Sequence, residues 1–177
     1  LAVLERYIEQ LETIRPDAAD LDPAWLDDAT VRTATREDPQ GPVGFYVDRV
    51  RALDTDRVRM FSPVLSRLYH DAHARLAADG THTELVLPTG AVERARDENP
   101  VEFRAVLGLG VLDLYRTPID VDVGVTLADD RVLLCAYGDD GQLAACVDST
   151  DDRVRDWATD RYEHHRDHGE RVHPHHA

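Results

Sequence analysis

Apolar residues recur along the chain with two different periods, which predicts helices alternating with strands. Before Pro16, four of them are spaced as on one face of a helix, with charged residues between them: Leu1, Leu4, Ile8 and Leu11. We therefore expect an amphipathic helix over residues 1–14. The pattern fits two interpretations equally well. The helix either packs on the domain, or it serves as a connector or a dimer contact.

From residue 29 onward the two patterns alternate. Strands are expected at 29–35, 58–61, 83–87 and 111–115. Helices are expected at 43–53 and 64–78, in the stretch around Glu93 and Glu98, and at 101–107. The buried stripe of the 64–78 helix is predicted to be Leu65, Leu68, Ala72 and Leu76, which leaves His70 and His73 on an exposed face. Strands that alternate with helices predict a largely parallel sheet.

Three closely spaced strands follow at 121–127, 132–137 and 142–147, joined by hairpin turns. A two-residue turn at Asp139 and Asp140 sets Cys135 opposite Ala144. Cys146 is then a diagonal neighbour about 7–8 Å away, too far for a disulfide bond. The other face of this hairpin is predicted to carry Val132, Leu134, Leu143, Ala145 and Val147. Since both faces are apolar, helices should cover the sheet on both sides.

A final helix is expected after Ser149 and Thr150, with a hydroxyl as its cap. The fold prediction is thus an α/β domain with a β-α-β-α-β-β-β-α core, a mixed and largely parallel sheet covered on both faces, and an N-terminal linker helix. We divide the chain into a linker or dimerisation helix (1–20), a domain (21–170) and a His-rich tail (171–177).

The charge of the chain restricts its partners. All 20 cationic residues are arginine, and 35 acidic residues give a formal net charge of -15. The absence of lysine excludes Schiff-base chemistry and a P-loop lysine. Because so acidic a domain repels nucleic-acid phosphates, we expect no DNA binding by this chain alone. The excess of acids is typical of a salt-rich cytoplasm.

No apolar run approaches the length of a membrane span, and we expect a cytoplasmic protein without membrane contact. The chain begins at Leu1 within a predicted helix, which indicates a piece of a longer protein.

Candidate chemistry is sparse. His164 and His168 have a spacing that can chelate Zn²⁺ or Ni²⁺, but the Glu of a zincin helix is missing and a solvated tail is the simpler interpretation. No nucleophile stands out, and we predict no catalytic residue, no metal and no cofactor.

Position within the sheet suggests a ligand site. Ligands of open α/β sheets lie beyond the carboxyl ends of parallel strands. The residues expected there are Ser62, Thr89 and Arg116, together with Tyr137. The alternative is that Ser62 and Thr89 only cap helices and that Arg116 pairs with a surface Asp.

The order of elements and several local patterns over 21–170 resemble the middle (effector) domain of haloarchaeal winged-helix transcriptional regulators of the methanogenesis regulatory protein type. The resemblance is carried by residues 38–42 (DPQGP), 61–64 (FSPV), 83–87 (TELVL), 126–134 (TLADDRVLL) and 157–162 (WATDRY). It implies an upstream winged helix that reads DNA and that this chain does not contain.

The domain of that family is also similar to half of a phospholipase D unit, whose motif is His-x-Lys-x4-Asp. If Asp129 is the acid of that motif, Asp122 and Gly124 stand where His and Lys belong. The nucleophile and the phosphate-binding lysine are therefore missing, which excludes phosphodiesterase chemistry at this motif.

The function predicted from these observations is a ligand-sensing and dimerisation domain of a transcription regulator, a homodimer that binds an unidentified small-molecule effector and touches DNA only through an absent N-terminal domain. Two alternatives remain: a small metal-dependent hydrolase or phosphodiesterase that uses the tail histidines and carboxylates, and a dimerisation scaffold without a ligand.

Overall fold

The computed structural model of the chain describes residues 20–174. The helix predicted over 1–14 and the end of the His-rich tail lie outside the described residues. Within the described part, no helix is long and apolar enough to cross a bilayer.

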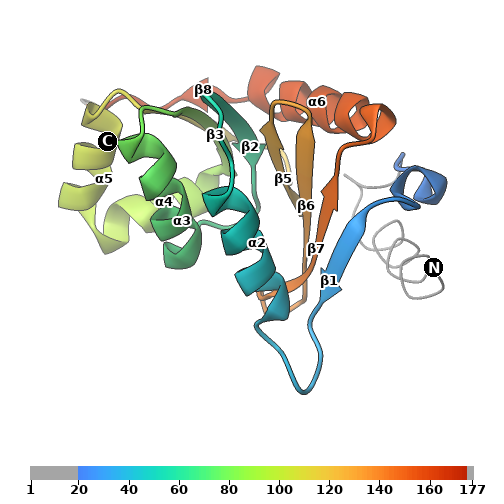
Figure 1. Ribbon diagram of the computed structural model, residues 1–177. Helices are drawn as coiled ribbons and strands as arrows, with labels where there is room; N and C mark the ends of the chain where they lie inside the picture. Colours follow the sequence, from blue (N-terminus) through green and yellow to red (C-terminus); the bar gives the residue numbers. More distant parts are fainter. Residues whose placement is uncertain (1–19, 175–177) are drawn as a thin grey trace.

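Eight strands form one mixed sheet in the order β1-β7-β6-β5-β2-β3-β4-β8 (Figure 1). The strands are β1 (Thr30–Thr33), β2 (Arg57–Phe61), β3 (His82–Pro88), β4 (Leu112–Thr117), β5 (Val123–Ala128), β6 (Arg131–Tyr137), β7 (Leu143–Ser149) and β8 (Glu170–Arg171). The helices are the short 3₁₀ helix η2 (Pro23–Leu26), α2 (Gly41–Arg51), α3 (Arg67–Ala78), α4 (Thr89–Glu98), α5 (Pro100–Gly108) and α6 (Asp152–Asp167). The predicted β-α-β-α-β-β-β-α core is confirmed, and β1 and β8 extend it at the two edges.

Helices cover both faces of the sheet, as predicted. On one face, α6 packs its apolar edge against β5, β6 and β2, and the buried side chains there include Phe61, Val125, Leu134 and Trp157. On the other face, α2, α3, α4 and α5 pack over a second cluster that includes Tyr46, Leu76, Leu87 and Leu133. Since each face has its own apolar core, the strands carry buried residues almost without interruption.

The prediction of a largely parallel sheet is wrong. Only β2 with β3 and β3 with β4 pair in parallel, while the other five pairings are antiparallel. The β-α-β-α-β segment supplies just three parallel strands. β5 then pairs antiparallel with the central strand β2, and the hairpins β5-β6-β7 extend the sheet from there.

The register predicted for the β6–β7 hairpin is also wrong. Its loop has three residues and closes through the Gly138 N–H, which donates to the Gln142 carbonyl at 2.9 Å. Gly141 adopts a positive φ of 76° there, a conformation that glycine accepts without strain. With a further irregularity at Ala136 and Tyr137, Cys135 comes directly opposite Cys146, with the two Sγ atoms 3.9 Å apart and both thiols free.

Leu143 accordingly pairs with Tyr137 and lies on the cysteine face, opposite to its predicted side.

Two helix predictions need correction at their ends. Helix α3 begins at Arg67, after the N-cap Ser66, so Leu65 precedes the helix and is 44% exposed rather than buried. Tyr69 takes a buried position of the stripe instead. Helix α6 is capped by the Asp151 carboxylate, which accepts from the Arg153 N–H, and not by a hydroxyl.

Candidate ligand-binding site

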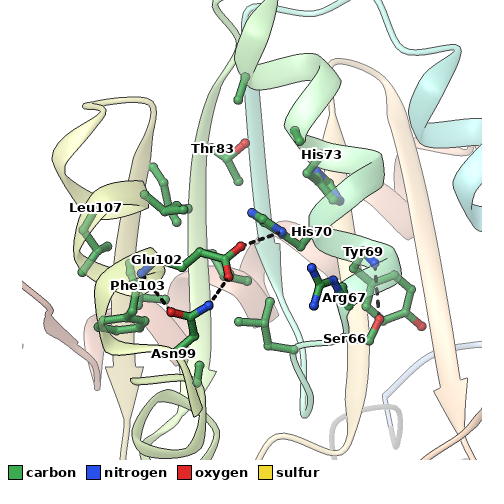
Figure 2. A pocket seen from close by; sticks show the side chains of 18 of the residues that line it. Ser66, Arg67, Tyr69, His70, His73, Thr83, Asn99, Glu102, Phe103 and Leu107 are labelled. Carbon is green, nitrogen blue, oxygen red and sulfur yellow. Dashed lines mark hydrogen bonds and ion pairs between the residues drawn. The ribbon is translucent and has the colours of Figure 1, made fainter. Parts of the chain in front are cut away.

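A pocket of about 900 Å³ lies between α3 on one side and α4 and α5 on the other (Figure 2). Strands β2, β3 and β4 form its floor, through the side chains of Met60, Thr83, Leu85, Leu112 and Leu114. This volume is within the range of pockets that bind small molecules.

The walls are apolar, and small side chains open the space between the helices. The alanines that line it are Ala74, Ala77 and Ala78 on α3 and Ala91 and Ala95 on α4. Helix α5 contributes larger apolar groups: Phe103, Val106 and Leu107. At the rim, Leu65 and Leu109 are 44% and 69% exposed. Exposed leucines beside an apolar pocket are typical of a binding surface.

Polar groups gather at one part of the pocket, where α3 faces α5 (Figure 2). Asn99, the N-cap of α5, donates from Nδ2 to Glu102 Oε2 at 2.7 Å and accepts from the Glu102 N–H at 3.2 Å. His70 Nδ1 lies 3.9 Å from Glu102 Oε1. Both side chains of this pair are more than two-fifths exposed, so the contact between α3 and α5 is weak and is easily opened.

Two of the predicted ligand residues, Ser62 and Tyr137, are brought together directly behind the α3 wall. The Tyr137 hydroxyl donates to the hydroxyl of the pocket-lining Tyr69 at 3.2 Å. Ser62 Oγ is 3.5 Å from the Tyr137 hydroxyl and donates to the Val64 carbonyl at 2.6 Å. Burial raises the pKa of Tyr69 and of Tyr137, so both phenols stay protonated.

A second buried polar chain contains His73, which also lines the pocket. The Tyr46 hydroxyl lies 2.8 Å from His73 Nε2 and 2.9 Å from Thr126 Oγ1. Burial, with a smaller contribution from the charge of His70, lowers the pKa of His73 to about 4. His73 Nδ1 is buried without a hydrogen-bond partner. The prediction that His73 is exposed is therefore wrong: its ring reaches inward to Tyr46.

The other two predicted residues, Thr89 and Arg116, do not line this pocket. Thr89 is the first residue of α4, and its hydroxyl donates to the Thr117 carbonyl at 3.2 Å. Arg116 Nη2 lies 2.9 Å from Glu170 Oε2, in an exposed ion pair between β4 and β8. Both contacts hold neighbouring segments together.

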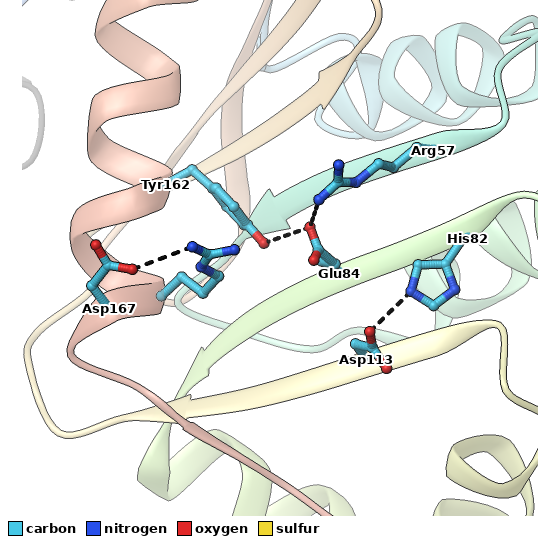
Figure 3. A network of polar contacts seen from close by, with 7 residues as sticks. Arg57, His82, Glu84, Asp113, Tyr162 and Asp167 are labelled. Atoms are coloured by element: carbon cyan, nitrogen blue, oxygen red, sulfur yellow. Dashed lines mark hydrogen bonds and ion pairs between the residues drawn. The ribbon is translucent and has the colours of Figure 1, made fainter.

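A network of polar contacts lies under α6, on the opposite face of the sheet (Figure 3). Glu84 is buried, and its Oε2 accepts from Arg57 Nη2 at 2.6 Å and from the Tyr162 hydroxyl at 3.1 Å. Next to it, His82 Nε2 is 3.0 Å from Asp113 Oδ2. Each of these carboxylates has a cationic or hydroxyl partner within the network. Because no carboxylate is left for a ligand, we assign the network a structural role.

The position that corresponds to the motif lysine, Gly124, leaves little room for a side chain. A Cβ atom on Gly124 would lie 3.2 Å from Cys135 Cβ and 3.3 Å from the ring of Tyr137. Asp129 is in the β5–β6 turn at a φ of 53°, where it accepts from the Thr55 hydroxyl at 3.0 Å. Cys135 and Tyr137 thus crowd the place of the first side-chain atom at position 124.

Within residues 20–174, no three His, Cys, Asp or Glu side chains converge as metal ligands would. The rings of His164 and His168 are 4.6 Å apart between centroids, and His168 Nδ1 lies 2.8 Å from the His164 carbonyl oxygen. The His168 side chain therefore contacts the backbone of its own helix.

The sequence matches the family model of the methanogenesis regulatory protein FilR1, middle domain, over residues 39–168. Among curated protein sequences, none matches this chain. Among solved structures, the archaeal chromatin protein TrmBL2, whose structure shows a novel mode of DNA binding, is similar with a TM-score of 0.60 at 14% identity. The match covers 97% of this chain and 63% of TrmBL2, so this chain spans less than two thirds of that protein.

Two other similar structures are those of a phospholipase D family member and of the protein NucT. Nuc from Salmonella typhimurium, a phospholipase D family member, has a TM-score of 0.60 at 10% identity, with 82% of this chain and 99% of Nuc covered. NucT from Helicobacter pylori has a TM-score of 0.60 at 10% identity, with 81% and 98% covered. At these identities the likeness shows the fold, which is that of a phospholipase D-like unit.

Proposed function

The chain belongs to the family of the methanogenesis regulatory protein FilR1 middle domain, and we propose that it senses a small-molecule effector on behalf of a transcription regulator. The observation that carries this proposal is the apolar pocket between α3 and α5. A domain of a regulatory family that has a pocket of ligand size, and no assembled catalytic group in its described part, is suited to binding rather than to turnover.

Catalysis by the phospholipase D route is not part of the proposal. The chain has no lysine. The position of the motif lysine is occupied by Gly124, which packs closely against Tyr137. The alternative of a metal-dependent hydrolase has no support from the described residues, because they contain no cluster of metal ligands. A scaffold without a ligand predicts the absence of a ligand-sized pocket, so the pocket favours sensing over it.

DNA contact is assigned to another segment of the regulator. The net charge of -15 opposes binding of this domain to phosphates. We propose that a winged helix precedes residue 1 and that the predicted helix over 1–14 joins it to this domain. An effector that binds one conformation of the pocket more tightly than another then shifts the regulator between two DNA-binding states.

The regulator is proposed to be a homodimer in the cytoplasm, with the helix over 1–14 as part of the dimer contact. Substitution of Leu4→Glu and Ile8→Glu is the direct test, since it places charges on the apolar side of that helix. Light scattering should give the dimer mass for the unaltered chain and a lower mass for the double variant. Equal masses would remove this helix from the interface.

The test of sensing blocks the pocket. Ala77 lines the pocket on α3, and Ala77→Phe is expected to fill part of it. Ala52→Phe is the matched control, because Ala52 is exposed after α2 and does not line the pocket. A metabolite panel is expected to raise the melting temperature of the unaltered chain and of the control, and to leave the Ala77→Phe variant unmoved. In the full-length regulator, the same compound is expected to change DNA affinity. A compound that stabilises all three proteins equally binds elsewhere and counts against the proposal.

A further inference from the structure

The pocket of the proposed function has a composition that specifies the chemistry of its ligand. Its floor and the α5 wall are hydrocarbon, with Leu85 and Leu114 below and Phe103 and Leu107 at the side. Apolar groups that leave water for such a surface gain about 25 cal/mol per Å². The ligand must therefore have a substantial apolar body.

Both arginines that line the pocket lack an ion pair with a described residue, and they differ in the acids near them. Glu102 has partners in Asn99 and His70. Arg94 has an acid of the pocket lining, Glu98, four residues later on α4. The acid at the same spacing from Arg67 is Asp71, which does not line the pocket. Arg67 lines the pocket from the first residue of α3 and forms no ion pair with any described residue.

Arg67 and His70 are one helical turn apart on α3 and line the same part of the pocket as Glu102 (Figure 2). A guanidinium group at the end of an apolar pocket matches a carboxylate, which it binds through two parallel N–H···O hydrogen bonds.

We propose that the pocket binds an apolar monocarboxylate, with its hydrocarbon body between α3 and α5 and its carboxylate at Arg67. This inference rests on the proposed function for its biological meaning, but its chemistry is tested by binding alone. Arg67 is the residue that selects the anionic head, and the β2–β4 floor with the α5 wall selects the apolar body.

Calorimetry with hexanoate, octanoate and decanoate tests the apolar body. Each added methylene group should lower the Kd about fourfold, the factor that corresponds to about 0.8 kcal/mol per buried CH₂. Ala77→Phe should abolish this dependence on chain length, whereas Ala52→Phe should retain it. The absence of binding across the series, or an equal series in the Ala77→Phe variant, would overturn the proposal.

A double-mutant-type cycle, in which the ligand head group and the side chain at position 67 are both varied, tests whether Arg67 binds the carboxylate. Arg67→Gln is expected to weaken decanoate binding about tenfold and to leave 1-decanol binding unchanged, because only the carboxylate uses the guanidinium. Arg75→Gln is the matched control: Arg75 is exposed on the same helix, does not line the pocket and forms no ion pair with a described residue. Equal loss for decanoate and decanol, or for the two arginine variants, would remove Arg67 from the head-group site.

The two proposals fail in different ways. Decanoate that binds through Arg67 but leaves the DNA affinity of the full-length regulator unchanged would sustain this ligand class and overturn sensing. A different metabolite class that acts through the pocket and changes DNA affinity, in a protein that does not bind decanoate, would sustain sensing and overturn the monocarboxylate.

Discussion

His73 is the side chain whose protonation the fold opposes most clearly. Its pKa is lowered to about 4 by burial, against about 6.5 in an unfolded chain. As the pH falls from 6.5 to 4, the unfolded chain therefore binds a proton that the folded chain does not. The stability that comes from the neutral ring is fully present above pH 6.5, is lost across this window and is gone below pH 4, at a cost of up to about 3 kcal/mol.

The substitution His73→Gln should flatten this part of the stability profile, because glutamine keeps a hydrogen-bonding group near Tyr46 but does not titrate. Urea unfolding at intervals between pH 4 and 7 measures it, and His70→Gln controls for removal of an imidazole from the same helix. If His70→Gln flattens the profile as much as His73→Gln, the assignment of the pH dependence to the buried ring of His73 is wrong.

Residue-level surprises arose where a side chain depends on a partner far away in the sequence. His73 lies off the apolar stripe of α3, but the hydroxyl of Tyr46, 27 residues earlier, draws it inward. Ser62 and Tyr137 were both predicted as ligand residues, and the structure places their hydroxyls 3.5 Å apart. The Tyr137 hydroxyl also donates to Tyr69, whose role the sequence did not indicate. Helical periodicity describes one element at a time and contains no information about such pairs.

At the scale of elements, the packing between β5 and β6 depends on the missing side chain of Gly124. Gly124→Ala places a Cβ atom 3.2 Å from Cys135 Cβ and 3.3 Å from the Tyr137 ring. Because these neighbours are buried in the sheet, we expect the substitution to destabilise the fold by about 1–3 kcal/mol.

Gly44→Ala is the opposite case and serves as the control. Gly44 lies inside α2, and a Cβ there meets nothing within 4 Å, so alanine should stabilise the helix by about 0.5–1 kcal/mol. Denaturant midpoints of the two variants should therefore move in opposite directions. Similar midpoints would show that Gly124 is not tightly packed.

The elements were predicted well from local periodicity, while their pairing was not. Strands β2 to β7 and helices α2 to α6 lie close to their predicted ranges. The antiparallel pairing of β2 with β5 joins segments more than 60 residues apart. The two-residue slip in the β6–β7 register depends on one extra loop residue and on the irregularity at Ala136 and Tyr137. The pocket was missed for the same reason, although alanines clustered on α3 and α4, Ala74, Ala77, Ala78, Ala91 and Ala95, were a signal of space between helices.

For the whole molecule, the net charge of -15 implies self-repulsion that salt relieves. The Debye length falls from about 10 Å at 0.1 M to about 3 Å at 1 M ionic strength, so most repulsion between exposed carboxylates is screened over that range. We expect the free energy of unfolding to rise with KCl concentration between 0.1 and 2 M.

A charge-reduced variant separates this screening from a general effect of salt on apolar burial. Asp28, Asp54, Asp130 and Asp139 are exposed, and none forms a hydrogen bond or ion pair with a described residue. Replacing all four by asparagine changes the net charge from -15 to -11, by removal of four negative charges. If repulsion is the cause, the variant should be more stable than the unaltered chain at 0.1 M KCl and should gain less from added salt, so that the two stability curves converge. Parallel curves would instead assign the salt effect to apolar burial, because that contribution does not depend on the four charges.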